Sequence, residues 1–80
     1  MLNNPILITR ALHSRADLYA ALAANTYRDK RPAPANLDAM ADLLREFQVS
    51  KIICAHWQLR EDDEQAVLEV LADLEIELQR

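Results

Sequence analysis

The chain has 80 residues, 51% of them hydrophobic and 28% charged, and its 13 acidic and 9 basic side chains give a formal net charge of -4. This length predicts one domain over residues 1–80. The acidic balance argues against nucleic acid or an anionic membrane as partner, because both attract basic surfaces. It is compatible with a basic protein partner.

Cys54 is the only cysteine in the sequence. An intramolecular disulfide therefore cannot form, which is typical of a reducing compartment. No apolar run approaches the roughly 20 residues of a membrane-spanning helix. The first residues also lack the basic and apolar regions of a signal peptide. We therefore expect a cytoplasmic protein.

Three segments predict strands. Residues 5–10 form a short apolar run rich in β-branched residues, with Pro5 at its start, where a missing N–H is tolerated. Residues 51–56 form a continuous apolar run, which is typical of a strand covered on both faces in a parallel sheet. Residues 74–79 alternate apolar and polar side chains, which predicts an edge strand with one polar face.

The first predicted helix covers residues 15–24. Ser14 and Asp17 have the spacing of a capping box, in which a hydroxyl is followed three residues later by an acid. We expect Asn25 to take the left-handed conformation that ends many helices. The residues expected on the buried side are Leu18 and Leu22.

A second helix is predicted over residues 36–46, after a loop that alternate prolines keep extended. Asn36 is a favourable N-cap residue. Asp38 and Asp42 lie four residues apart on one face, where like charges repel by a few tenths of a kcal/mol. A pair that destabilises the helix suggests a cationic surface on a partner. The apolar stripe at helical spacing consists of Leu37, Met40, Ala41 and Leu44.

The acids at residues 61–64 predict the start of a third helix, because they complement its positive end. Asp62 and Gln65 have the capping-box spacing. Helices between strands act as crossovers, so the order strand, helix, helix, strand, helix, strand predicts an α/β fold with a three-stranded parallel sheet. The residues expected on the buried side of the third helix are Ala66, Val67, Val70 and Leu71.

With this order of elements, the chain resembles the barstar family of ribonuclease inhibitors. The similarity centres on residues 36–39, which read Asn-Leu-Asp-Ala, and on Asp42. It continues without a gap through Phe47 to residues 57–59 and resumes at residues 67–71. Upstream, the matching residues of the first helix are Asp17, Leu18 and Leu22, with one residue gained in the following loop.

The resemblance implies a barstar-like fold and inhibition by occlusion. Members of the family place the second helix and the loop before it in the basic active site of a small ribonuclease, where carboxylates take the place of RNA phosphates. Asp38 and Asp42 would be these mimics, and Asp73 a further acid facing the enzyme. We expect no catalytic residue, cofactor, metal or small-molecule substrate. The implied partner-binding residues are Asn36, Leu37, Asp38, Ala41, Asp42, Phe47 and Asp73.

The chain departs from the family pattern near this site. Pro32 and Pro34 stand where the family often has an aromatic residue and a glycine, and Ala41 replaces an aromatic residue. The loop also carries three cations that would repel a basic enzyme if they faced it. They are Arg28, Lys30 and Arg31. An alternative function therefore stays open: a small scaffold or regulatory protein of the same fold with a partner other than a ribonuclease.

The implied contact residues also have simpler interpretations. Asp38 is a first-turn acid that the helix dipole favours, and Asp42 can pair with Arg45 on a solvated face. Asp73 fits an ordinary surface acid, and Phe47 fits packing against the core.

Cys54 and His56 are the remaining residues with possible chemistry. On a strand they would point to the same face, about 7 Å apart. A thiolate–imidazole pair needs hydrogen-bond reach, and a zinc site needs four ligands, or three and a water. We expect Cys54 to be a small buried apolar residue instead.

Overall fold

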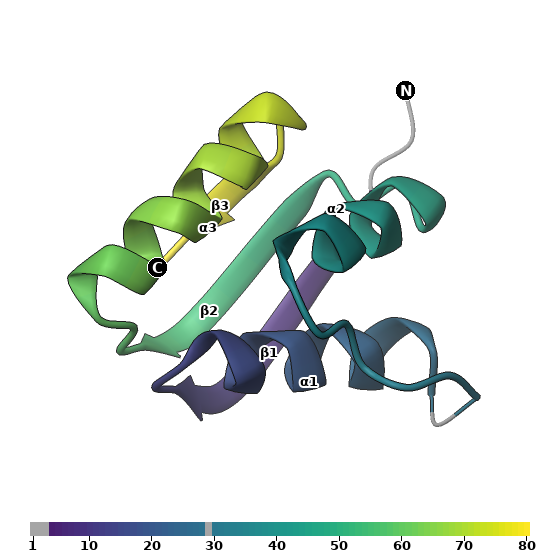
Figure 1. Cartoon of the computed structure of the whole chain (residues 1–80), viewed down its shortest axis with the longest axis horizontal. Helices are drawn as coiled ribbons and strands as arrows, with labels where there is room; N and C mark the ends of the chain where they lie inside the picture. Colours follow the sequence, from purple (N-terminus) through teal and green to yellow (C-terminus); the bar gives the residue numbers. More distant parts are fainter. Residues whose placement is uncertain (1–3, 29) are drawn as a thin grey trace.

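The computed structural model describes residues 4–28 and 30–80, which contain three strands and three helices in the expected order (Figure 1). The strands are β1 (Pro5–Leu12), β2 (Lys51–Trp57) and β3 (Glu77–Gln79), and the helices are α1 (Arg15–Thr26), α2 (Leu37–Glu46) and α3 (Glu61–Asp73). The strands form a parallel sheet in the order β1-β2-β3. The predicted α/β fold is therefore confirmed.

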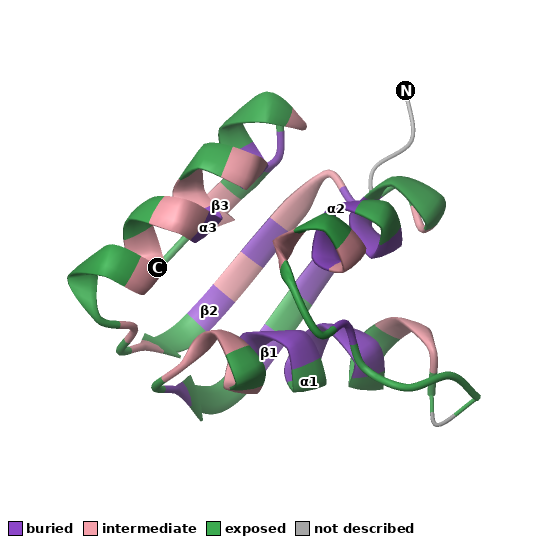
Figure 2. Cartoon of the chain, viewed as in Figure 1, coloured by how far each residue is buried: buried purple, intermediate pink, exposed green. Residues whose placement is uncertain are grey.

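The helices cover one face of the sheet. Strand order follows chain order, so both crossovers step in the same direction, and crossovers of one hand place their helices on the same face. Along β2, Ile52 and Cys54 are buried, whereas Ile53 is half-buried and Ala55 is exposed, an alternation visible in Figure 2. Leu7, the neighbour of Ile53 on β1, is 57% exposed. The prediction that β2 is covered on both faces is wrong, because its apolar run extends onto an open face.

The hydrophobic core lies between the covered face of the sheet and the helices. The predicted buried stripes are confirmed in most positions, although Leu37, Ala66 and Val70 are only half-buried. Leu43 of α2 is fully buried and was not among the predicted core residues. Each large apolar side chain that is fully buried contributes about 1.5–3 kcal/mol to the stability of the fold, because it is removed from water. The largest fully buried side chains are Ile8, Leu12, Leu18, Leu22, Met40, Leu43, Leu44, Ile52 and Val67.

Helix α1 begins as predicted and ends later. The Ser14 hydroxyl accepts a hydrogen bond from the Asp17 N–H at 3.1 Å, and the Asp17 carboxylate accepts one from the His13 N–H at 2.9 Å. The prediction for Asn25 is wrong: it stays helical, and its side-chain amide donates to a carbonyl one turn back at 2.9 Å. The positive φ falls on Arg28 instead, at 51°.

Helix α3 begins before its predicted capping box. Its N-cap is Arg60, which makes no side-chain cap bond. Asp62 lies inside the first turn, where its carboxylate accepts from the Asp63 N–H at 3.1 Å. The expectation that Asp62 caps the helix is therefore wrong. The acids of the first turn still lie where they offset the positive helix end.

The outer strands differ in length from their predictions. The strand predicted over residues 5–10 continues to Leu12 in β1, past an irregularity in its pairing with β2. The strand predicted over residues 74–79 is shortened to β3, because Leu74 caps α3 and Glu75 takes a φ of 58° that turns the chain. β3 lies at an edge of the sheet, as predicted.

Candidate functional site

Helix α2 holds two aspartates on a rigid base. Its inner side packs into the core through Met40, Leu43 and Leu44, whose exposed fractions are 1% or less. Asp38 and Asp42 are exposed on the same helix. Residues four apart in a helix have Cβ atoms about 5–6 Å apart. We call these two residues the acidic face of α2. Because the other side of the helix is held in the core, the helix position is fixed while both carboxylates stay accessible.

The two carboxylates differ in their partners. Arg45 Nη1 lies 3.2 Å from Asp42 Oδ1, and the two side chains are 62% and 79% exposed. This pairing was foreseen from the sequence, and exposed pairs of this kind are worth only about 0.3–0.5 kcal/mol. Asp38 makes no hydrogen bond or ion pair within residues 4–28 and 30–80. Both carboxylates can therefore accept a partner's cation at little internal cost.

Asn36 sets the start of the acidic face. Its side-chain oxygen accepts a hydrogen bond from the Ala39 N–H at 2.8 Å, which confirms it as the N-cap of α2. Leu37 follows and packs half-buried against the core. These two residues join the extended loop to α2 and hold its first turn in place, and the exposed side chain of Asp38 belongs to this turn.

Replacing Asn36 by alanine is expected to lower the free energy of unfolding by about 1 kcal/mol, because the cap bond to the Ala39 N–H is lost. Urea denaturation followed by circular dichroism measures this change. Asn36→Ser is the matched control, because serine caps helices comparably and should retain most of the stability. Equal losses in the two variants would contradict a capping role.

Ala41 and Phe47 offer less to a partner than the resemblance implies. Ala41 is 8% exposed and belongs to the inner side of α2. Phe47 follows the helix, half-buried, with its ring centroid 5.7 Å from that of Tyr27 and the rings tilted by 55°. The packing interpretation of Phe47 agrees with this contact. It lies at the opposite end of α2 from Asn36.

Asp73 is the last residue of α3 and is exposed. It has no ion pair or hydrogen bond among the described residues. The residue that follows it, Leu74, lines a hollow shared with Leu44 and Arg45 of α2. Asp73 therefore lies nearer to the carboxyl end of α2, whereas Asp38 lies in the first turn of that helix.

Arg31, one of the three loop cations, folds onto the end of α2. Its guanidinium carbon lies 3.9 Å from the centroid of the Tyr27 ring and 5.9 Å from that of Phe47. Its two Nη atoms pair with both carboxylate oxygens of Glu46, with Nη1 to Oε1 at 3.2 Å. Hydrogen bonding to Arg31 lowers the pKa of Glu46. The positive charge of Arg31 is therefore balanced within the protein, an arrangement that sequence reasoning missed.

The Arg31–Glu46 pair is expected to make stability depend on pH. The folded-state pKa of Glu46 lies below its ordinary value of 4.5, so the pair stabilises the fold above that value and loses its effect as the pH falls through the folded pKa. Glu46→Gln should therefore be less stable than the wild type at pH 7, and the difference should vanish in acid. Urea midpoints at several pH values measure this trend.

The control for this comparison is Glu69→Gln, which changes an exposed glutamate of α3 that has no ion-pair partner among the described residues. Its difference from the wild type should stay small at every pH. Added salt should shrink the effect of Glu46→Gln, since the pair is about half exposed. A gap between the wild type and Glu46→Gln that widens in acid would contradict the assignment.

The remaining reactive residues lie apart from this site. Cys54 is 3% exposed, and burial raises the pKa of its thiol. His56, two residues on, is exposed. The expectation that Cys54 is a buried apolar residue is confirmed. In the part of the chain that the structure describes, no group of three or more His, Cys, Asp or Glu side chains could hold a metal ion. Nor does any described helix combine the length and apolar character needed to cross a bilayer.

Comparison of the chain with family models, curated proteins and solved structures found no match in any of the three. The interpretation of the site therefore depends on its geometry and on the sequence pattern of residues 36–42. Both point to the acidic face of α2 as the candidate binding surface.

Proposed function

We propose that the protein inhibits a small ribonuclease by placing the acidic face of α2 in the basic active site of the enzyme. The observation that carries this proposal is the pair of exposed carboxylates, Asp38 and Asp42, on a helix whose opposite side is held in the core by Met40, Leu43 and Leu44. Ribonuclease active sites bind a polyanion through Arg, Lys and His side chains. Carboxylates can make charge-assisted hydrogen bonds to the same groups.

Rigidity supports the same proposal. A surface that is ordered before binding loses little conformational entropy when the complex forms. The core contacts of α2 and the cap at Asn36 supply this order. The resemblance of residues 36–42 to the barstar family adds a sequence pattern to the geometry. In such a role the protein would act in the cytoplasm.

The net charge of -4 also favours a basic partner. One of the three loop cations, Arg31, is paired with Glu46, whereas Arg28 and Lys30 are exposed and would repel a basic enzyme if they faced it. Complementary charges accelerate encounter and fix the orientation of the complex. A tight complex would also need roughly 800 Å² of buried surface on each partner.

Calorimetric titration and RNA-cleavage assays against small basic ribonucleases from the source organism and its competitors test the proposal. One of these enzymes is expected to bind with 1:1 stoichiometry and to lose its activity at equimolar inhibitor. The association rate should fall as salt is added. The absence of inhibition across the set would contradict the proposal.

The matched variants are Asp38→Asn with Asp42→Asn, which neutralise the acidic face, and Asp62→Asn with Glu69→Gln, which neutralise two exposed acids on α3. The first pair should abolish inhibition, whereas the second pair should leave it nearly unchanged. Similar losses in both would show that net charge alone, and not the acidic face, drives the interaction.

The second candidate is a scaffold or regulatory protein of the same fold with another partner. The open face of the sheet favours it, because Leu7 is 57% exposed and is paired in register with half-buried Ile53. A partner on that face would not use the acidic face of α2. Leu7→Lys should therefore leave ribonuclease inhibition unchanged if the first proposal is correct.

A further inference from the structure

The outer edge of β1 has no neighbouring strand among the described residues. β1 stands at the end of the strand order and pairs with β2 alone (Figure 1). In a strand, the backbone groups of successive residues point alternately to the two edges. The Asn4 carbonyl accepts a hydrogen bond from the Ser50 N–H at 3.2 Å, at the start of the pairing with β2. Pro5 and Leu7, which alternate with Asn4, therefore direct their backbone groups away from β2.

This edge is open to a partner strand. Within residues 4–28 and 30–80, no helix or loop makes a hydrogen bond to the backbone of Pro5 or Leu7. The irregularity in β1 lies beyond Ile8, so the stretch before it pairs regularly. Proteins often protect an edge with charged side chains, because an unpaired row of N–H and C=O groups pairs readily with another chain. No charged residue occurs between Pro5 and Thr9.

A hollow adjoins the edge, between the start of β1 and the end of α1. Its volume is about 410 Å³. Residues 4–7 line the strand side, and the other side includes Asn25, Thr26 and Phe47. Among the described residues that line the hollow, Arg28 carries the charge. A side chain of an added strand could therefore reach a cation beside the edge.

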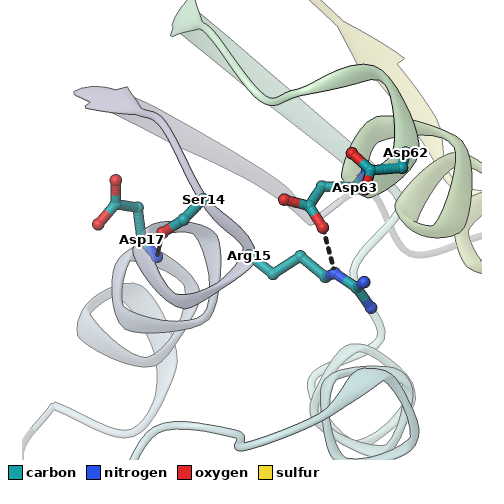
Figure 3. A network of polar contacts seen from close by, with 5 residues as sticks. All are labelled: Ser14, Arg15, Asp17, Asp62 and Asp63. Carbon is teal, nitrogen blue, oxygen red and sulfur yellow. Dashed lines mark hydrogen bonds and ion pairs between the residues drawn. The ribbon is translucent and has the colours of Figure 1, made fainter.

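The cations near this edge differ from most others in the protein. Arg15 is balanced internally: its Nε lies 2.7 Å from Asp63 Oδ1, and Figure 3 shows the side chain extended towards Asp63. Arg10 of β1 and Arg28 of the hollow are exposed and make no ion pair in the described part of the chain. Both ends of the edge therefore carry unbalanced positive charge. The cations that do have an ion-pair partner are Arg15, Arg31, Arg45, Lys51 and Arg80.

We propose that the outer edge of β1 binds an extended, acidic segment of another protein, which adds to the sheet as a fourth strand. The backbone of Leu7 would hydrogen-bond the segment, as in other complexes formed by strand addition. A Glu or Asp side chain of the segment would enter the hollow and pair with Arg28. A basic segment would be repelled, because the edge lies between two unbalanced cations. The edge shares no residue with the acidic face of α2, so the inference is independent of the proposed function.

An NMR titration of the isotope-labelled protein with the peptide Ac-Glu-Val-Glu-Val-Glu-Val-amide tests the inference. Amide shifts are expected at Leu7, Thr9 and Arg28 and not at Asp38 or Asp42, and exchange of the Leu7 N–H with solvent deuterium should slow. The analogue with lysine in place of every glutamate should bind at least about tenfold more weakly, because the arginines repel it. The absence of shifts along β1, or equal binding of the two peptides, would overturn the inference.

Methylated peptides test whether a strand is added. One analogue of the acidic peptide carries N-methyl groups on its valines, and the other carries them on its glutamates. Because alternate residues point to opposite edges, one analogue keeps the N–H groups that face β1 and the other loses them. We therefore expect one analogue to bind and the other to fail. Equal behaviour of the two analogues would contradict strand addition.

Two arginine substitutions test the hollow. Arg28→Gln should weaken binding of the acidic peptide by roughly threefold. The matched control is Arg60→Gln, which changes an exposed arginine at the N-cap of α3 that has no ion pair among the described residues and should leave binding unchanged. Equal losses would mean that overall charge, and not Arg28, attracts the peptide. If inorganic phosphate caused the same shifts as the peptide, the site would be one for small anions and the inference would fail.

Discussion

Asp42→Ala is expected to weaken ribonuclease inhibition by roughly 30-fold or more, equivalent to about 2 kcal/mol or more of binding free energy. Removing one carboxylate leaves the cation that it contacts desolvated and unpaired in the complex, which is the main reason for so large a loss. The free energy of unfolding should change by less than about 0.5 kcal/mol, because Asp42 has only an exposed partner in Arg45. Inhibition titrations and urea denaturation measure the two quantities separately.

Glu69→Ala is the control for this prediction. It removes one negative charge from an exposed position of α3 and should slow association slightly without a large change in affinity. If wild type and Asp42→Ala inhibited equally, the acidic face of α2 would not be the binding surface. If Asp42→Ala unfolded the protein, its role would be structural.

Leu43→Ala is expected to lower the free energy of unfolding by about 2–5 kcal/mol, since the side chain is 0% exposed and its loss leaves a cavity. A chain of this length has roughly 4–12 kcal/mol of stability in total. The melting temperature should therefore fall by about 10 °C or more. Thermal and urea denaturation, followed by circular dichroism and by the fluorescence of Trp57, the single tryptophan, measure the change.

The matched control is Leu7→Ala, the same substitution on the open face of the sheet, where the side chain is 57% exposed. It should change the free energy of unfolding by well under half as much. Comparable losses at Leu7 and Leu43 would mean that the open face is covered in solution, contrary to the structure.

The predictions that succeeded depend on short-range patterns. Asn36 caps α2 because its side chain reaches an N–H three residues away, and the apolar stripe that follows has a helical period. The spacing of Asp38 and Asp42 on that helix follows from the same period. The parallel pairing of the strands also follows from local information, since helices alternate with strands along most of the chain.

The predictions that failed needed information from distant parts of the chain. Whether Ile53 is covered depends on the direction in which the crossovers pass over the sheet, and both pass on the same side. The end of α1 at Asn25 is the exception, because its side-chain amide donates to the Ala21 carbonyl within the same helix and does not end it. The position of Arg31 depends on Glu46, fifteen residues further on, so its sequence neighbours gave no sign of the pair.

The candidate site divides in the same way. The acidic face of α2 could be read from one helix, whereas the hollow between the start of α1 and the segment 33–38 depends on how distant parts of the chain pack together. Asp73 was assigned by resemblance alone. The position of Asp73 relative to the acidic face depends on how α3 packs against α2, and no local sequence pattern predicts that packing.

The open face of the sheet offers a place to attach a fluorescent probe. Thr9 is exposed on β1, away from the acidic face of α2, and Cys54 is buried with a raised thiol pKa. A maleimide dye should therefore react with the new thiol of Thr9→Cys and spare Cys54, because the thiolate is the reactive form. A dye placed there would report complex formation by anisotropy while leaving both the helix layer and the binding surface untouched.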